Sequence, residues 1–156
     1  MFTVNEMVEV NPSVKSIEIS SIEARRFSKP GEKVMNVRID NNSTVTLINQ
    51  IDEATANINF RYTASYGGMG VITIEGSIVF ECEAADIVER WQKTNNMPNE
   101  IANQVHTAIM RLCMPEAVLL SRDIKLPPPI PMPKINIPSE PSRDRKGRRH
   151  HGMEVA

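Results

Sequence analysis

Few side chains in this sequence have a type and spacing that could support catalysis. His106 is the only histidine before the last seven residues, and its helical neighbours Asn103, Gln104 and Met110 offer no carboxylate or thiol at ligand spacing. An isolated helical histidine is typically exposed or hydrogen-bonded rather than catalytic. Because residues that are distant in sequence can converge in a fold, an enzyme with a site around His106 remains a minor alternative.

The glycine-rich and cysteine motifs also favour a structural interpretation. Gly67 and Gly70 join two apolar runs and no lysine follows them, whereas a phosphate-binding loop needs a helix N-terminus directly after the turn. Cys82 and Cys113 are the only cysteines, so they can form neither a disulfide framework nor a four-cysteine zinc site. We therefore predict two small buried thiols and a hairpin, with no catalytic residue, metal ligand or cofactor.

Charge and proline are unevenly distributed along the 156 residues. Residues 143–156 carry five basic and two acidic side chains, whereas the rest of the chain carries 13 basic and 17 acidic ones. No apolar run approaches the ~18 residues that a membrane helix needs. The first ten residues lack the basic and apolar regions of a secretory signal. We expect a cytoplasmic protein without membrane insertion.

Apolar and polar side chains alternate along several stretches, the period of two that predicts half-buried strands. These stretches are residues 17–24, 35–39, 44–51, 57–66 and 71–82. Residues 40–43, Asp-Asn-Asn-Ser, have turn chemistry and predict a hairpin between the second and third stretches. The alternation slips by one residue near Ser20 and Ser21, which predicts a β-bulge.

The period changes to that of helices after Cys82. A short helix is predicted around residues 84–91, and Asn96 is expected to cap a second helix that carries an apolar stripe over residues 101–112. Pro115 is expected to kink or restart this second helix. The sum is an α+β fold, in which C-terminal helices pack on one face of a four- to five-stranded antiparallel sheet.

Residues 126–137 alternate proline with aliphatic side chains. Such a segment cannot join the interior of a sheet and favours the extended polyproline II conformation. Its aliphatic side chains would be exposed to water in a free linker, so we expect it to pack along the domain. The alternative is a PxxP ligand for some other module.

The order of these elements resembles the SecB family of export chaperones. The resemblance covers roughly residues 14–137. It rests on Tyr-Thr-Ala-Ser-Tyr-Gly-Gly at 62–68, Ile-x-Ile-x-Gly at 72–76, Cys82 at the end of the return strand, and the helix exit at 125–137.

What the resemblance implies is an ATP-independent holdase rather than an enzyme. Members of that family are homotetramers, dimers of dimers, that hold unfolded polypeptides or preproteins in hydrophobic grooves, in some cases for export. The grooves lie between the crossover loop of the early strands and the loop that leaves the long helix. The corresponding residues of this chain are Phe27, Leu126, Ile130, Met132, Ile135 and Ile137.

The resemblance also divides the chain into an N-terminal extension (1–13), a SecB-like domain (14–137) and a disordered basic tail (138–156). This tail replaces the lid helix and acidic end of the family, so a partner in the export machinery is left open. A SecB-fold interaction or regulatory protein remains the alternative, serving a toxin–antitoxin system or tethered to nucleic acid by the tail. The tail has no aromatic residue for base stacking, which makes nucleic acid the weaker partner.

Overall fold

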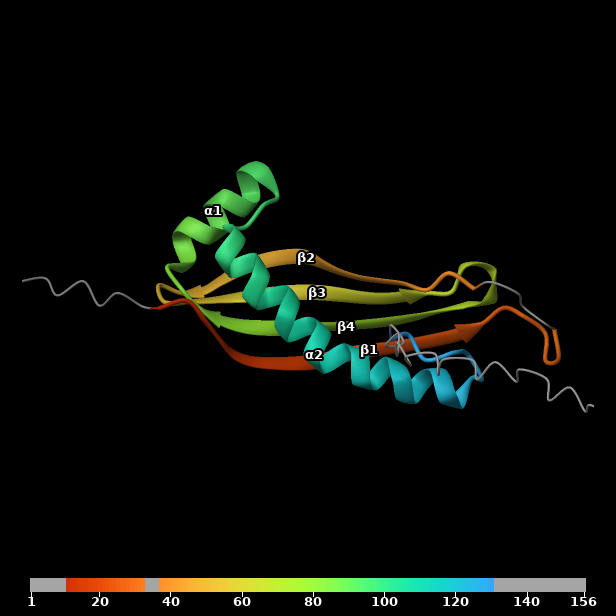
Figure 1. Ribbon diagram of the computed structural model, residues 1–156. Helices are drawn as coiled ribbons and strands as arrows, with labels where there is room; N and C mark the ends of the chain where they lie inside the picture. Colours follow the sequence, from red (N-terminus) through yellow and green to blue (C-terminus); the bar gives the residue numbers. More distant parts are fainter. Residues whose placement is uncertain (1–10, 33–36, 131–156) are drawn as a thin grey trace, which may run out of the picture.

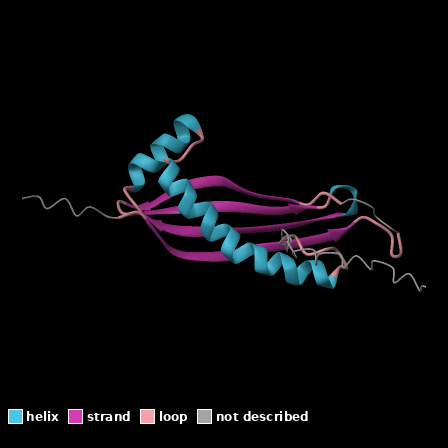
Figure 2. Cartoon of the chain, viewed as in Figure 1, coloured by secondary structure: helices cyan, strands magenta, loops and turns pink. Residues whose placement is uncertain are grey.

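The structure is a computed structural model that describes residues 11–32 and 37–130. Its elements are β1 (Ser13–Arg26), β2 (Asp40–Asp52), β3 (Thr55–Ser65), the 3-10 helix η1 (Gly67–Met69), β4 (Gly70–Glu81), α1 (Ala84–Thr94) and α2 (Asn99–Asp123). The four strands form one layer, and α2 runs diagonally across one face of it (Figure 1, Figure 2). The prediction of an α+β fold, with helices on one face of an antiparallel sheet, is confirmed.

The strand order is β1-β4-β3-β2, and each neighbouring pair is antiparallel. Tight connections join β2 to β3 and β3 to β4. The chain therefore crosses from one edge of the sheet to the other between Arg26 and Asp40, which leaves β1 and β2 as the two edge strands among the described residues.

Two register shifts adjust the edge strand β1 to its neighbour β4. They lie between Val14 and Ser16 and between Ile19 and Ser21, so the predicted bulge near Ser20 is confirmed. Ile17 lies opposite Ile78 and Ile22 lies opposite Ile74. Since side chains of opposite residues share a face, the bulge keeps the apolar side chains of β1 on the helix side of the sheet.

The prediction of a hairpin turn at residues 40–43 is wrong. These residues belong to β2, which runs without interruption from Asp40 to Asp52. Residues 37–39, the described part of the predicted strand 35–39, are not in a strand, and residues 33–36 lie outside the described residues. The described sheet accordingly has four strands, within the predicted range.

Distant partners explain why the polar residues 40–43 extend a strand. Tyr62 of β3 donates its hydroxyl hydrogen bond to Asn41 Oδ1, and Ser43 Oγ is hydrogen-bonded to His106 Nδ1 of α2. Asn and Ser favour turns when they bond their own backbone. Here the side chains of Asn41 and Ser43 bond to other elements instead, so this competition with the strand is removed.

Helix α2 differs from its prediction at two points. Its N-cap is Pro98, whose carbonyl accepts the Ala102 N–H at 2.9 Å, so the expected cap at Asn96 is wrong. Pro115 lies inside one continuous helix, so the helix does not restart there. The buried stripe repeats every fourth residue and faces the sheet: Ile101, Val105, Ile109, Cys113, Ala117 and Ser121.

The two faces of the sheet differ in polarity. The core lies between the helices and the inner face, and the largest fully buried side chains from β3 and β4 are Ile58, Phe60, Tyr62, Ile72, Ile74, Ile78 and Phe80. The outer face carries polar side chains, among which Arg61 and Glu75 form an ion pair at 2.7 Å. One face thus provides the core, while the other is solvated.

Several sequence predictions concern residues outside the described part of the chain. They are the groove residues Met132, Ile135 and Ile137, the extension up to residue 10, and the tail over residues 138–156. Among the described helices, none has the length and apolar composition required to cross a membrane.

Candidate functional site

The two segments predicted to border a groove meet where β1 ends and β4 begins. The guanidinium Nη1 of Arg26 donates to the Ile124 carbonyl at the end of α2, at 3.5 Å. The next residue, Phe27, donates its backbone N–H to the carbonyl of Met69 at 2.8 Å. The crossover loop after β1, the helix exit and η1 are therefore held together at this corner.

Gly70 allows this close approach. A Cβ atom placed on it would lie 3.0 Å from Leu126 Cδ1 and closer still to the backbone of β1. The Leu126 side chain is only 5% exposed and belongs to the core. Leu126 therefore anchors the helix exit against the sheet.

The end of α2 reverses the chain through a Schellman motif. The N–H of Leu126 donates to the Ser121 carbonyl at 2.8 Å, and that of Lys125 donates to the Arg122 carbonyl at 3.3 Å. Lys125 has φ +56°, the left-handed conformation that this motif requires and that glycine usually supplies. The reversal directs residues 126–130, here termed the strap, back over the sheet.

The strap crosses the sheet from β4 towards β2. After Leu126 packs beside Gly70 of β4, the Pro127 carbonyl accepts a hydrogen bond of 2.7 Å from the hydroxyl of Tyr66, which follows β3. The Pro129 carbonyl accepts one of 2.8 Å from Nδ2 of Asn41 in β2. The described part of the proline-rich segment thus packs along the domain, as expected.

Two predicted groove residues remain open to solvent at the borders of this region. The side chain of Phe27 is 56% exposed on the crossover loop, and that of Ile130 is 41% exposed at the end of the strap. A hollow of about 380 Å³ lies beside the crossover loop, with Val37, Tyr66 and Met69 in its lining. Because Tyr66 also bonds to the strap, the hollow and the strap share a wall.

The candidate site also depends on three residues that were not predicted to belong to it. Asn41 and Tyr66 hold the strap, and Tyr62 orients Asn41. One feature of the sequence could have indicated them: the only two tyrosines of the chain, Tyr62 and Tyr66, lie on the same face of an alternating stretch, and both are buried. A buried tyrosine hydroxyl normally finds a hydrogen-bond partner.

The pair Ser43 and His106 does not form a catalytic triad. Within residues 11–32 and 37–130, no carboxylate is hydrogen-bonded to His106 as the orienting group of a triad would be. Burial lowers the pKa of His106 below its ordinary 6.5, which favours the neutral imidazole. The pair fastens α2 to β2.

The cysteine thiols are buried and protonated. Burial raises the pKa of Cys82 and that of Cys113 to about 11, so the reactive thiolate is scarce at neutral pH. In the described part of the chain, no three His, Cys, Asp or Glu side chains lie close enough together to hold a metal ion.

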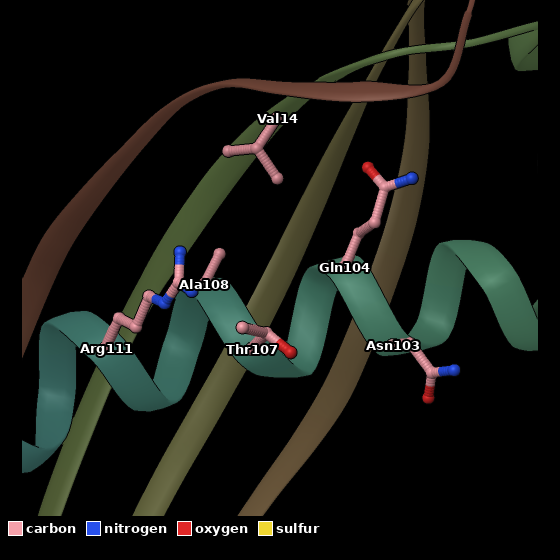
Figure 3. Close-up of a pocket in the computed structure, with 6 residues that line it drawn as sticks. All are labelled: Val14, Asn103, Gln104, Thr107, Ala108 and Arg111. Carbon is pink, nitrogen blue, oxygen red and sulfur yellow. The ribbon is translucent and has the colours of Figure 1, made fainter.

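A separate hollow of about 400 Å³ lies between the start of β1 and α2. In Figure 3 the side chains of Gln104 and Ala108 point toward the sheet, while that of Asn103 points away. Among the described residues that line it, Arg111 alone is charged. The amide and guanidinium groups of this lining can form hydrogen bonds, but they do not provide an acid–base pair for proton transfer.

Comparison with protein-family models and with curated proteins finds no match. A solved structure of a SecB-like chaperone from Mycobacterium tuberculosis, in complex with a ChAD peptide from an antitoxin, aligns with 81% of this chain and 92% of its own. The aligned chains are 11% identical in sequence, with a TM-score of 0.49. At these values the likeness does not identify the function of this chain.

Proposed function

We propose that this protein is an ATP-independent holdase that binds unfolded polypeptides at the surface between the crossover loop and the strap. The observation that carries the proposal is the exposure of Phe27 and Ile130 at the borders of a region that is otherwise built and fixed by hydrogen bonds. An exposed apolar surface on a folded chain typically marks an interaction site.

The chemistry of this surface suits clients without a defined shape. The hollow beside the crossover loop is lined by the apolar side chains of Val37 and Met69 together with polar and charged ones, among them Glu32 and Arg38. Methionine adapts to irregular partners, and the charged side chains lie at the border of the apolar ones. Such contacts select for apolar, extended chain rather than for one sequence.

Two further features support the proposal. The element order β1 to β4, α1, α2 is the order on which the sequence resemblance to the SecB family rests. The edge strands β1 and β2 leave main-chain groups for pairing with other copies. In line with what the resemblance implies, we also propose a cytoplasmic homo-oligomer, a dimer of dimers, that performs no catalysis.

Suppression of client aggregation tests this function. We expect the full chain, without nucleotide, to keep a chemically unfolded client in solution, as measured by light scattering of the diluted client. Phe27→Asp and Ile130→Asp should each reduce the protection several-fold, because a charge in the contact surface must be desolvated when the client binds.

Leu47→Asp is the matched control for these two variants. Leu47 is 45% exposed and lies opposite Asn59, on the outer face of the sheet. It therefore presents a similar apolar area away from the proposed surface. Equal protection by all three variants and the parent chain would overturn the assignment of the surface, and no protection by the parent chain would overturn the function.

A further inference from the structure

The strap is held in a bed whose donors and pockets recognise its backbone. We infer that this bed is a binding site for extended, proline-containing segments of other polypeptides, and that the strap is its internal ligand. The bed is defined by Gly70, Tyr66, Asn41 and Tyr62. The inference rests on the proposed function, because it specifies the kind of client segment that the protein holds.

The bed presents hydrogen-bond donors to carbonyl groups two residues apart. The Tyr66 hydroxyl donates to Pro127 and the Asn41 amide donates to Pro129. Proline has no N–H, so its carbonyl is the only backbone group that needs a partner. Aromatic and polar donors that bind carbonyls of an extended chain are also how other domains recognise polyproline II segments.

The donors are also held by groups other than the strap. The Tyr62 hydroxyl bonds to Oδ1 of Asn41, which leaves Nδ2 of the same amide directed at the strap. Burial raises the pKa of Tyr62 to about 12, so its hydroxyl remains protonated as a donor. Both tyrosine side chains are fully buried in the domain, which restricts their rotation.

Two side-chain positions define the preferred ligand. The Leu126 side chain enters the space beside Gly70, and Pro129 is fully buried. Ile130 follows with its side chain exposed. The complementary segment is therefore an aliphatic residue followed by prolines, with the residue three positions after the aliphatic one also buried.

The attachment of the strap to α2 favours exchange with such a segment. Lys125 holds the left-handed conformation at φ +56°, which is strained for a residue with a side chain. Release of the strap would relieve this strain. A segment from another chain could then make the same contacts with the bed without imposing a strained backbone on Lys125.

A fluorescent peptide with the sequence of residues 124–131, Ile-Lys-Leu-Pro-Pro-Pro-Ile-Pro, is the probe. In the full chain, Leu126→Asp should free the bed, because a carboxylate cannot occupy the buried space beside Gly70. By fluorescence anisotropy we expect this variant to bind the peptide at least about tenfold more tightly than the parent chain does. A second full-chain variant, with glycine at positions 127–129, loosens the strap while it retains Leu126.

Removal of one hydroxyl distinguishes recognition by the bed from non-specific apolar binding. Adding Tyr66→Phe to either loosened variant should weaken peptide binding roughly fivefold, the value of one hydrogen bond. Thr63→Val, which removes a hydroxyl from β3 on the outer face, should leave it unchanged. The inference is overturned if neither cooperatively folded variant binds the peptide, or if Tyr66→Phe has no effect.

Aggregation assays on the same variants separate this inference from the proposed function. If the chain protects unfolded clients but does not bind the peptide, the bed is only a structural attachment and the holdase function remains. If the peptide binds but no client is protected, the bed is confirmed as a site and the holdase function is wrong.

Discussion

At the scale of single residues, the left-handed positions that end the two helices carry different costs. Asn95 ends α1 at φ +53°, and Lys125 lies in the turn after α2 at φ +56°. Asparagine adopts this conformation more readily than lysine does, because its short polar side chain can bond locally. The turn that directs the strap onto the sheet is therefore the more strained of the two.

Lys125→Gly should stabilise the protein by about 1 kcal/mol in the free energy of unfolding, since glycine adopts a positive φ without steric cost. Urea unfolding followed by circular dichroism measures the change. Asn95→Gly is the control and should give a smaller gain. A lower stability of Lys125→Gly would show that its backbone is not the source of strain.

His106 should make the stability depend on pH. Burial lowers its pKa in the folded protein below the ordinary 6.5, so the unfolded chain takes up the proton at the higher pH. The contribution of His106 is complete above the unfolded-state pKa and is lost as the pH falls toward the folded one. Between about pH 7 and pH 5, the unfolding free energy should therefore decrease more in the parent chain than in His106→Gln. Parallel curves would contradict the burial of this side chain.

At the scale of elements, the bulge of β1 and the glycine beside it in β4 together allow β1 to lie close to the core. Gly76 of β4 pairs with Ile19, beside the register shift that ends at Ser21. A Cβ atom on Gly76 would lie 2.7 Å from Phe60 Cζ and closer to the Glu18 carbonyl oxygen. Strand β1 and the ring of Phe60 can therefore lie this close to each other only because Gly76 has no side chain.

Gly76→Ala should lower the free energy of unfolding by about 1–3 kcal/mol, the usual cost of overpacking a core. Thermal unfolding measures the difference. Gly68→Ala is the matched control, because a Cβ atom there meets no atom within 4 Å. If the two variants are equally stable, β1 does not approach β4 as closely as described.

The elements that could be predicted from sequence are those whose pattern is local. Strands β3 and β4 and the stripe of α2 follow from periodicity alone. The start of β2 could not be predicted, because the turn preference of Asn41 and Ser43 is overcome by Tyr62 and His106, which lie far along the chain. Local propensity is a weak guide where tertiary partners are available.

The same limit applies to the candidate site. Its apolar residues could be selected from the resemblance, but the role of each could not. Leu126 is an anchor in the core, whereas Phe27 and Ile130 are exposed. The hydrogen bonds that position the strap join residues 61 and 88 positions apart, and no spacing rule connects them.

At the scale of the whole molecule, function is expected on the helix side of the sheet. Most side chains of the outer face are polar, and they include the ion pair of Arg61 and Glu75, although Leu47 is also exposed there. The other side combines the core with the strap, whose last residue, Ile130, is exposed. A client should therefore contact the protein at the corner where β1, η1 and the end of α2 meet.

Site-specific photocrosslinking tests this account most directly. The photoreactive amino acid benzoylphenylalanine replaces Phe27 in one full-length variant and Leu47, on the outer face, in another, and each is irradiated with an unfolded, labelled client. We predict client crosslinks from position 27 and few or none from position 47. Equal crosslinking from both positions, or crosslinks from position 47 alone, would contradict the account.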